Sequence, residues 1–182
     1  MTVGEDQCEL AAIADPAPAG EALAAEMGVA WFADYDEMLG VVEPDGVVVA
    51  TPNQMHLPAA VACAERGAHI LMEKPIAHSL DAGRDLVRAV NRAGVRLTVG
   101  HHRRFDPAAG AAKAIIDGGE IGDLLAVSAT WAVRKPAAYF GVKWRRETGG
   151  GVVLINLIHE IDCLRFVVGE ITSVRAFTSN AV

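Results

Sequence analysis

The sequence predicts an α/β protein built on a parallel sheet, because three features of its pattern agree. Short apolar runs alternate with helical patterns, and the connections between them are brief. The runs are apolar on both faces, as is typical of parallel strands that helices cover on each side. Small polar residues or proline precede several helical patterns, and glycine ends them. Repeated units of this kind predict right-handed βαβ crossovers.

Five strands are expected in the first part of the chain. They cover residues 10–14, 30–32, 47–50, 69–72 and 95–99. Helical patterns lie between them, at 20–27, after Asp34, from about Pro58 to Gly67, and at 80–93. Asp34 followed by Glu37 resembles a capping box, and Ser79 offers a second cap. The carboxyl ends of parallel strands meet at one edge, so one rim should carry Asp15, Thr51, Glu73 and Gly100.

The regular alternation of strand and helix patterns ends near residues 100–106, which predicts a first domain over 1–102 and a second over 103–182. The second part is expected to hold part of an α/β domain with an open sheet. Its elements are a helix from Asp106-Pro107 to Gly118-Gly119, a strand at 124–131, an apolar helix at 152–168 and a last strand at 171–178.

Composition narrows the class of protein. The chain has 182 residues, of which 52% are hydrophobic, and its formal net charge is −7. That charge argues against nucleic acid or an anionic membrane as the main partner. No apolar run is long enough to span a membrane, and the first residues lack the plan of a signal peptide. Three widely spaced cysteines among apolar neighbours predict a reduced, cytoplasmic protein.

Two charged residues at strand ends call for a functional explanation. Lys74 lies in Glu-Lys-Pro after the strand 69–72, although a turn needs no ammonium group and open α/β sheets bind ligands at this edge. Asp15 is the kind of acid that binds an adenosine ribose, but such an acid follows a glycine fingerprint by roughly 20 residues. No G-x-G-x-x-G precedes Asp15. Asp15 is therefore either a surface carboxylate, or the first strand, loop and helix are absent.

Six motifs together identify a resemblance. They are AIADP, VVVATPNQMHLPAA, HILMEKPIAHSL, VGHHRRFDP, WRRETGGG and LIHEIDCLRFVVGEI. In order and spacing they resemble the Gfo/Idh/MocA oxidoreductases, which include glucose–fructose oxidoreductase and inositol dehydrogenase. The resemblance implies an N-terminal Rossmann domain and a C-terminal α/β domain whose open sheet often forms a dimer. The chain resembles the middle of such a protein: the Rossmann-like sheet lacks its first βα unit, and most of the second sheet is missing.

The resemblance implies NAD as cofactor, with NADP disfavoured because the carboxylate of Asp15 would repel a 2′-phosphate. It implies a polyhydroxy small molecule as substrate, a homo-oligomer formed through the C-terminal sheet, and no metal. The catalytic residues implied are Lys74 and His159. The positions implied to contact the cofactor are Asp15, Thr51, Pro52, Asn53, His56, Glu73, Pro75, Arg103, Trp144 and Arg145.

These roles suit the oxidation of a secondary alcohol. An imidazole at His159 can take the hydroxyl proton near neutral pH, and the ammonium of Lys74 can stabilise charge on the oxygen. A cis bond before Pro75 could fix the direction of the lysine. Simpler interpretations stay open: Lys74 as a surface charge, His159 in a structural hydrogen bond with Asp162, and His56 as a helix cap. The sequence HEIDC lacks the second histidine of a zinc motif.

One position departs from the family pattern. Dehydrogenases of the family often carry an aspartate four residues before the histidine, where this chain has Ile155, and Asn156 should point about 100° away around the helix. A non-catalytic, cofactor-sensing module is therefore an alternative to an enzyme, and an inactive remnant is a third. Without a first strand, the strands ending at Asp15 and Ala50 either pair directly or accept a partner chain, and NAD should bind weakly.

Overall fold

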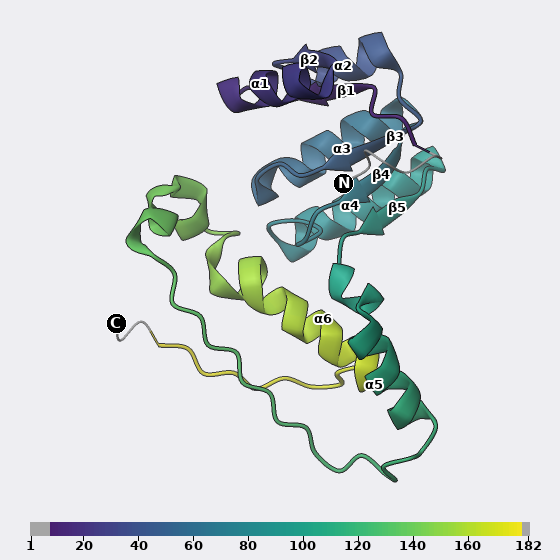
Figure 1. Cartoon of the computed structure of the whole chain (residues 1–182), viewed down its shortest axis with the longest axis vertical. Helices are drawn as coiled ribbons and strands as arrows, with labels where there is room; N and C mark the ends of the chain where they lie inside the picture. The colour runs from purple at the N-terminus through teal and green to yellow at the C-terminus, as the bar shows by residue number, and fades with distance from the viewer. Residues whose placement is uncertain (1–7, 180–182) are drawn as a thin grey trace. The chain divides into compact units, whose positions relative to one another are not determined.

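The computed structural model describes residues 8–179 in two compact units, the first ending at Gly100 and the second beginning at His101 (Figure 1). The first unit alternates strands and helices. Its elements are β1 (Ala12–Ala14), α1 (Pro18–Met27), β2 (Ala30–Phe32), α2 (Tyr35–Val42), β3 (Gly46–Val49), α3 (His56–Glu65), β4 (His69–Met72), α4 (Leu80–Ala93) and β5 (Leu97–Val99). All strand pairs are parallel. The predicted α/β class and all five strands are confirmed.

The helix boundaries follow from the capping residues. Asp34 Oδ1 accepts hydrogen bonds from the backbone N–H groups of Asp36, at 2.7 Å, and Glu37, at 3.4 Å. Ser79 Oγ accepts from the N–H of Ala82 at 3.2 Å and begins α4. Gly94 ends α4 with a left-handed φ of 70°, a conformation that costs little only in glycine.

The strands form two sheets rather than one. β1 pairs with β2, while β4 lies between β3 and β5. The expectation of a single rim is therefore wrong, because a sheet is continuous only where neighbouring strands exchange backbone hydrogen bonds, and β1 bonds to β2 but not to β3. The possibility that β1 and β3 pair directly is also excluded.

The core of the first unit lies between β3–β4 and the helices α3 and α4. Met72, Leu86 and Cys63 are almost completely buried there. The other face of the sheet is open to solvent, since Val48 is 54% exposed and its register partner Leu71 is 42% exposed. The expectation that helices cover both faces is thus wrong for this sheet, because α3 and α4 bury only the side chains that alternate with these two.

The second unit is helical. Among the described residues it holds α5 (Pro107–Asp117), a π-helical segment at Val153–Leu157 and α6 (Ile158–Val167), with short 3₁₀ turns between α5 and the π segment. The strands predicted at 124–131 and 171–178 are wrong: both segments are irregular. Alternating side chains make a segment competent for a sheet, but it becomes a strand only when a neighbour shares its backbone hydrogen bonds.

The apolar helix predicted at 152–168 is present, but its first part has the wider π geometry. No side chain caps the π segment. The spacing that placed Ile155 one α-helical turn before His159 therefore does not apply, since bonds in a π helix run from i to i+5. No helix within residues 8–179 is long and apolar enough to cross a lipid bilayer.

Candidate functional site

The carboxyl ends of β3, β4 and β5 bring Thr51, Glu73 and Gly100 to one rim of the larger sheet. The N–H of Glu73 donates to Val49 O at 2.9 Å, and the N–H of Gly100 donates to Met72 O at 2.7 Å. These bonds continue the strand pairing just beyond the strands. A Cβ on Gly100 would lie 3.4 Å from Met72 O, so the chain passes close to the Glu-Lys-Pro turn.

Lys74 lies in this turn, half-buried between exposed Glu73 and buried Pro75. The Lys74–Pro75 peptide bond is cis, as the sequence had suggested it could be. Glu73 Oε2 accepts a hydrogen bond from the backbone N–H of Lys74 at 3.1 Å. The backbone of the lysine is therefore held from one side by its neighbour's carboxylate.

His56 joins the two loops of this rim. Its side chain is 1% exposed, Nδ1 lies 2.8 Å from Pro75 O, and Nε2 lies 2.9 Å from Thr51 O. The interpretation of His56 as a helix cap is wrong, because Met55 occupies the cap position of α3 and no side chain caps this helix. Its neighbour Asn53 is 4% exposed, and Pro52 is exposed.

Thr51 offers a polar atom toward this rim. Its Oγ1 is buried and makes no hydrogen bond to the described residues. A buried hydroxyl without a protein partner usually meets water or a ligand. The hydroxyl therefore has unused hydrogen-bonding capacity at the strand ends, the edge at which open α/β sheets bind ligands.

Asp15 lies at the carboxyl end of β1, on the smaller sheet. Its Oδ1 accepts from the N–H of Ala17 at 2.8 Å, and Trp31 Nε1 donates to Asp15 O at 3.0 Å. A Cβ on Gly20 would lie 2.3 Å from the Cβ of Asp15, so α1 approaches this closely only because residue 20 is glycine. Sequence reasoning missed Trp31 and Gly20, although both lie in elements that it predicted beside Asp15.

In the second unit, charged pairs fasten the turn His102–Phe105 to α6. Arg103 pairs with Glu160, and Arg104 donates to Asp162 at 2.7 Å and 2.5 Å. Burial would raise the pKa of Asp162, but the Arg104 hydrogen bonds and nearby positive charges outweigh it and hold that pKa below its usual 3.8. Asp162 thus anchors this turn.

His159 lies on α6 against the same turn. Its ring centroid is 5.0 Å from that of His102, in an edge-on contact. His159 is partly buried. The paired residues Arg103 and Glu160 directly follow His102 and His159 in the sequence. The second unit therefore places two imidazoles together, and sequence reasoning had assigned a role to His159 alone.

Trp144 and Arg145 lie in the 3₁₀ turn Lys143–Arg146. The Arg145 guanidinium is 4.3 Å from the Tyr139 ring centroid and 5.7 Å from that of Trp144, and it donates to Tyr139 O at 3.1 Å. A cation held over aromatic rings is oriented before any anion arrives. Tyr139 was not predicted, though it is the aromatic residue in the same polar loop.

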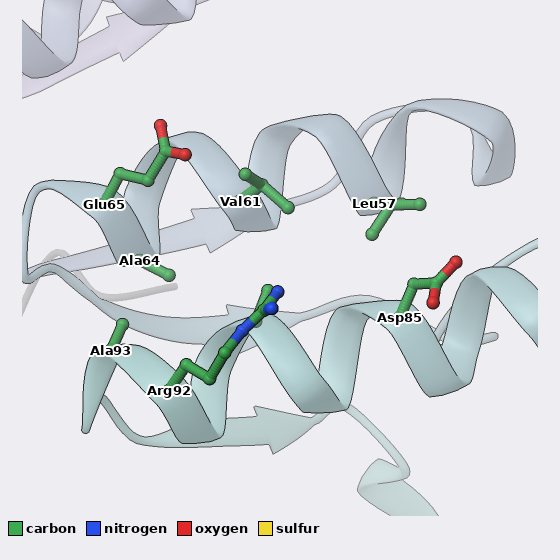
Figure 2. A pocket seen from close by; sticks show the side chains of 8 residues that line it. Leu57, Val61, Ala64, Glu65, Asp85, Arg92 and Ala93 are labelled. Carbon is green, nitrogen blue, oxygen red and sulfur yellow. The ribbon is translucent and has the colours of Figure 1, made fainter.

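A groove is present away from the strand ends. It runs between α3 and α4 with a volume of about 570 Å³ (Figure 2). Its lining residues are Leu57, Val61, Ala64, Glu65, Asp85, Ala89, Arg92 and Ala93. None of the predicted site residues lines this groove, so it is separate from the candidate site.

Comparison with known proteins agrees with the motifs. Residues 2–101 match the family described as an oxidoreductase family with an NAD-binding Rossmann fold, and residues 110–182 match the GFO/IDH/MocA C-terminal domain. An uncharacterized oxidoreductase of Streptococcus pneumoniae is 34% identical, covering 97% of this chain and 48% of its own. The scyllo-inositol 2-dehydrogenase (NAD(+)) of Bacillus subtilis is 35% identical, covering 91% of this chain and 48% of its own.

A solved structure supports the same assignment. The WlbA dehydrogenase of Bordetella pertussis, in complex with NADH and UDP-GlcNAcA, matches with a TM-score of 0.80 at 29% identity. The match covers 91% of this chain and 49% of WlbA. The chain spans about half the length of the curated relatives it matches. By its two domain matches and these relatives, the chain belongs to the Gfo/Idh/MocA family of oxidoreductases.

Proposed function

We propose that this chain carries parts of the site of an NAD-dependent oxidoreductase that acts on CH–OH groups of a sugar, inositol or related polyhydroxy compound. The observation that carries the proposal is the rim of the larger sheet, where His56 joins the turn of half-buried Lys74 to the loop that carries the unpartnered hydroxyl of Thr51. A relative named scyllo-inositol 2-dehydrogenase (NAD(+)) and the WlbA dehydrogenase, solved with NADH and UDP-GlcNAcA, support the same class of substrate.

The cofactor would supply the hydride acceptor. Asp15 would bind the adenosine ribose and select NAD over NADP by repelling a 2′-phosphate. Thr51, Pro52, Asn53 and His56 would form the loop under the dinucleotide; of these we assign the direct polar contact to Thr51, since His56 is occupied by two carbonyls. Glu73 and Pro75 would hold the turn beside the nicotinamide.

Two residues would act on the substrate. Lys74 would stabilise negative charge on the reacting oxygen, and His159 would accept the hydroxyl proton. Arg103, Trp144 and Arg145 would border the nicotinamide end; the guanidinium of Arg145, already oriented over Tyr139, suits a contact with an anionic group. Arg103 would act through its pair with Glu160.

Several further properties belong to this proposal. We infer a domain boundary near residue 102, a cytoplasmic location supported by three free cysteines, and a homo-oligomer formed through the C-terminal segments. The irregular segments 124–131 and 171–178 support the last point, because Leu125, Val174 and Phe177 are exposed there and offer apolar surface to a second copy.

The test is a panel of polyols and sugar derivatives, with NAD reduction followed spectroscopically in the 182-residue chain. We expect slow turnover with at least one polyol, and Lys74→Ala should lower it by roughly 10²- to 10³-fold, as loss of one group that stabilises a reacting oxygen does. Lys113→Ala is the matched control, because Lys113 pairs with Asp117 on α5.

Full turnover in Lys74→Ala would remove the lysine from the mechanism. A second candidate function is a non-catalytic module that senses the cofactor, and Ile155 in place of the family's aspartate favours it. Saturable NAD binding with no turnover on the whole panel would support this module. An inactive remnant would neither bind nor turn over.

A further inference from the structure

The His56 ring is placed between two backbone carbonyl groups that belong to different loops. Nδ1 lies 2.8 Å from Pro75 O, in the turn after β4, and Nε2 lies 2.9 Å from Thr51 O, in the loop after β3. With 1% of its surface exposed, the ring has no solvent to replace either partner. Both contacts are thus internal to the rim of the larger sheet.

Carbonyl oxygens only accept hydrogen bonds, so a ring nitrogen bonds to its carbonyl only where that nitrogen carries a proton. Which nitrogen donates depends on the tautomer, but both nitrogens lie within hydrogen-bond distance of a carbonyl oxygen. The ring therefore contacts both loops in either tautomer.

The turn that carries Lys74 is tied to β3 and its loop at two points. Pro75 follows Lys74 directly and lies against the His56 ring, and the N–H of Glu73 donates to Val49 O at 2.9 Å. We propose that His56 is a positioning residue: through its contacts with Thr51 O and Pro75 O, it holds the loop after β3 to the turn after β4 and fixes the backbone from which Lys74 projects.

This role differs from that of a cofactor ligand. Both ring nitrogens of His56 face protein carbonyls, so the residue acts through Lys74 rather than through contact with NAD. The inference rests on the proposed function only for the role of Lys74. The joining of the two loops by His56, here called the lock, is a property of the chain without cofactor.

Amide hydrogen exchange in the 182-residue chain separates this local role from general stability. In His56→Leu, the Glu73 amide should exchange roughly tenfold faster or more, because the buried polar contacts that hold its turn are lost. The Ile70 amide, which donates to Arg96 O at 2.8 Å near the other end of β4, should change little.

His69→Leu is the matched control, because it also removes a histidine whose ring bonds to backbone. His69 Nδ1 accepts from the N–H of Arg96 at 3.1 Å. This variant should speed exchange at Ile70 and leave Glu73 unchanged. Equal acceleration of Glu73 and Ile70 in His56→Leu would mean that His56 contributes only to overall stability, and would overturn the proposal.

The variants His56→Asn and His56→Gln test the contacts with Pro75 O and Thr51 O separately. They also keep a polar side chain at this position, in case the leucine variant does not fold. The amide nitrogen of asparagine is as many bonds from Cα as Nδ1 of histidine, and that of glutamine as many as Nε2. His56→Asn should therefore keep the bond to Pro75 O and the Glu73 protection, while His56→Gln should keep only the bond to Thr51 O and lose most of that protection. The opposite order would overturn the assignment.

A parallel NAD titration of the wild-type chain keeps this inference separate from the proposed function. No NAD binding, together with the expected exchange pattern, would refute the proposed cofactor site and leave the lock standing. Saturable NAD binding with no difference between His56→Leu and His69→Leu at Glu73 would refute the lock alone.

Discussion

At the scale of single residues, Asp162 joins the turn before α5 to α6. Its carboxylate is 7% exposed and receives two hydrogen bonds from Arg104, and His101 Nδ1 lies 3.7 Å away. Its pKa is below the ordinary value of 3.8 because these partners outweigh burial, which alone would raise it. The folded state therefore binds this proton less readily than the unfolded state does.

Because the folded pKa is depressed, the stability from Asp162 is fully present above pH 3.8 and is lost as the pH falls below that value. We expect the unfolding midpoint of the wild-type chain to fall more steeply than that of Asp162→Asn as the pH drops from about 4 to about 2. Asp123→Asn, at an exposed carboxylate, should keep the wild-type slope. Parallel slopes for wild type and Asp162→Asn would contradict this assignment.

Residue roles were predictable only where the partner is close in sequence. Asp34 and Ser79 were identified as caps because the N–H groups they bind lie two or three positions away. His56 was assigned to the cofactor by resemblance, but its contact with Pro75, 19 residues distant, could not be predicted because it depends on how two loops meet. The Arg104–Asp162 bond, 58 residues apart, was missed for the same reason.

At the scale of elements, the first unit follows its sequence closely because each strand and helix carries a local signal. β4 and α4 have the boundaries that the pattern predicts, with apolar runs stopped by the Glu-Lys-Pro turn and by Gly94. The segments 124–131 and 171–178 carry the same alternation but are not strands, because pairing is a property of two segments and no pattern within one can supply it. No pattern in the sequence indicated the π segment before α6.

The close packing of the Trp144–Arg145 turn against Gly150 is also an element-scale property. A Cβ at residue 150 would lie 2.5 Å from Trp144 O and 3.0 Å from Arg145 O, both backbone atoms that cannot rotate away. We expect Gly150→Ala to displace this turn and to lower the free energy of unfolding by about 1–3 kcal/mol, as overpacking does.

Gly141→Ala is the control for this prediction, because a Cβ there meets nothing within 4 Å. Amide NMR spectra of both variants provide the measurement: shifts at residues 143–147 should change in Gly150→Ala and stay close to wild type in Gly141→Ala. Unchanged shifts in both variants would show that the turn does not depend on the glycine.

At the scale of the whole molecule, the chain holds two compact units and two separate sheets in the first of them. Asp15 ends a strand of one sheet, and Lys74 follows a strand of the other. The sequence predicts the direction of every strand, but it could not show that β1 and β3 would stay apart, because that depends on which backbone groups find a partner. Residues assigned to one cofactor are thus carried by separate sheets.

Cofactor binding depends on these two sheets together. The 182 residues contain no G-x-G-x-x-G loop to hold a pyrophosphate, so the ribose end at Asp15 and the rim at Thr51 and Lys74 would supply most of the affinity. We therefore expect NAD to bind, but weakly, with a dissociation constant of about 1 mM or above.

The most direct measurement is a calorimetric titration of NAD into the folded chain, at protein concentrations suited to millimolar affinity. We expect weak, saturable binding that Asp15→Ala abolishes and that NADP does not reproduce. Asp81→Ala, at an exposed carboxylate of α4, should leave the binding unchanged. No heat of binding from a folded sample, or equal binding of NAD and NADP, would contradict the claim that this chain retains part of an NAD site.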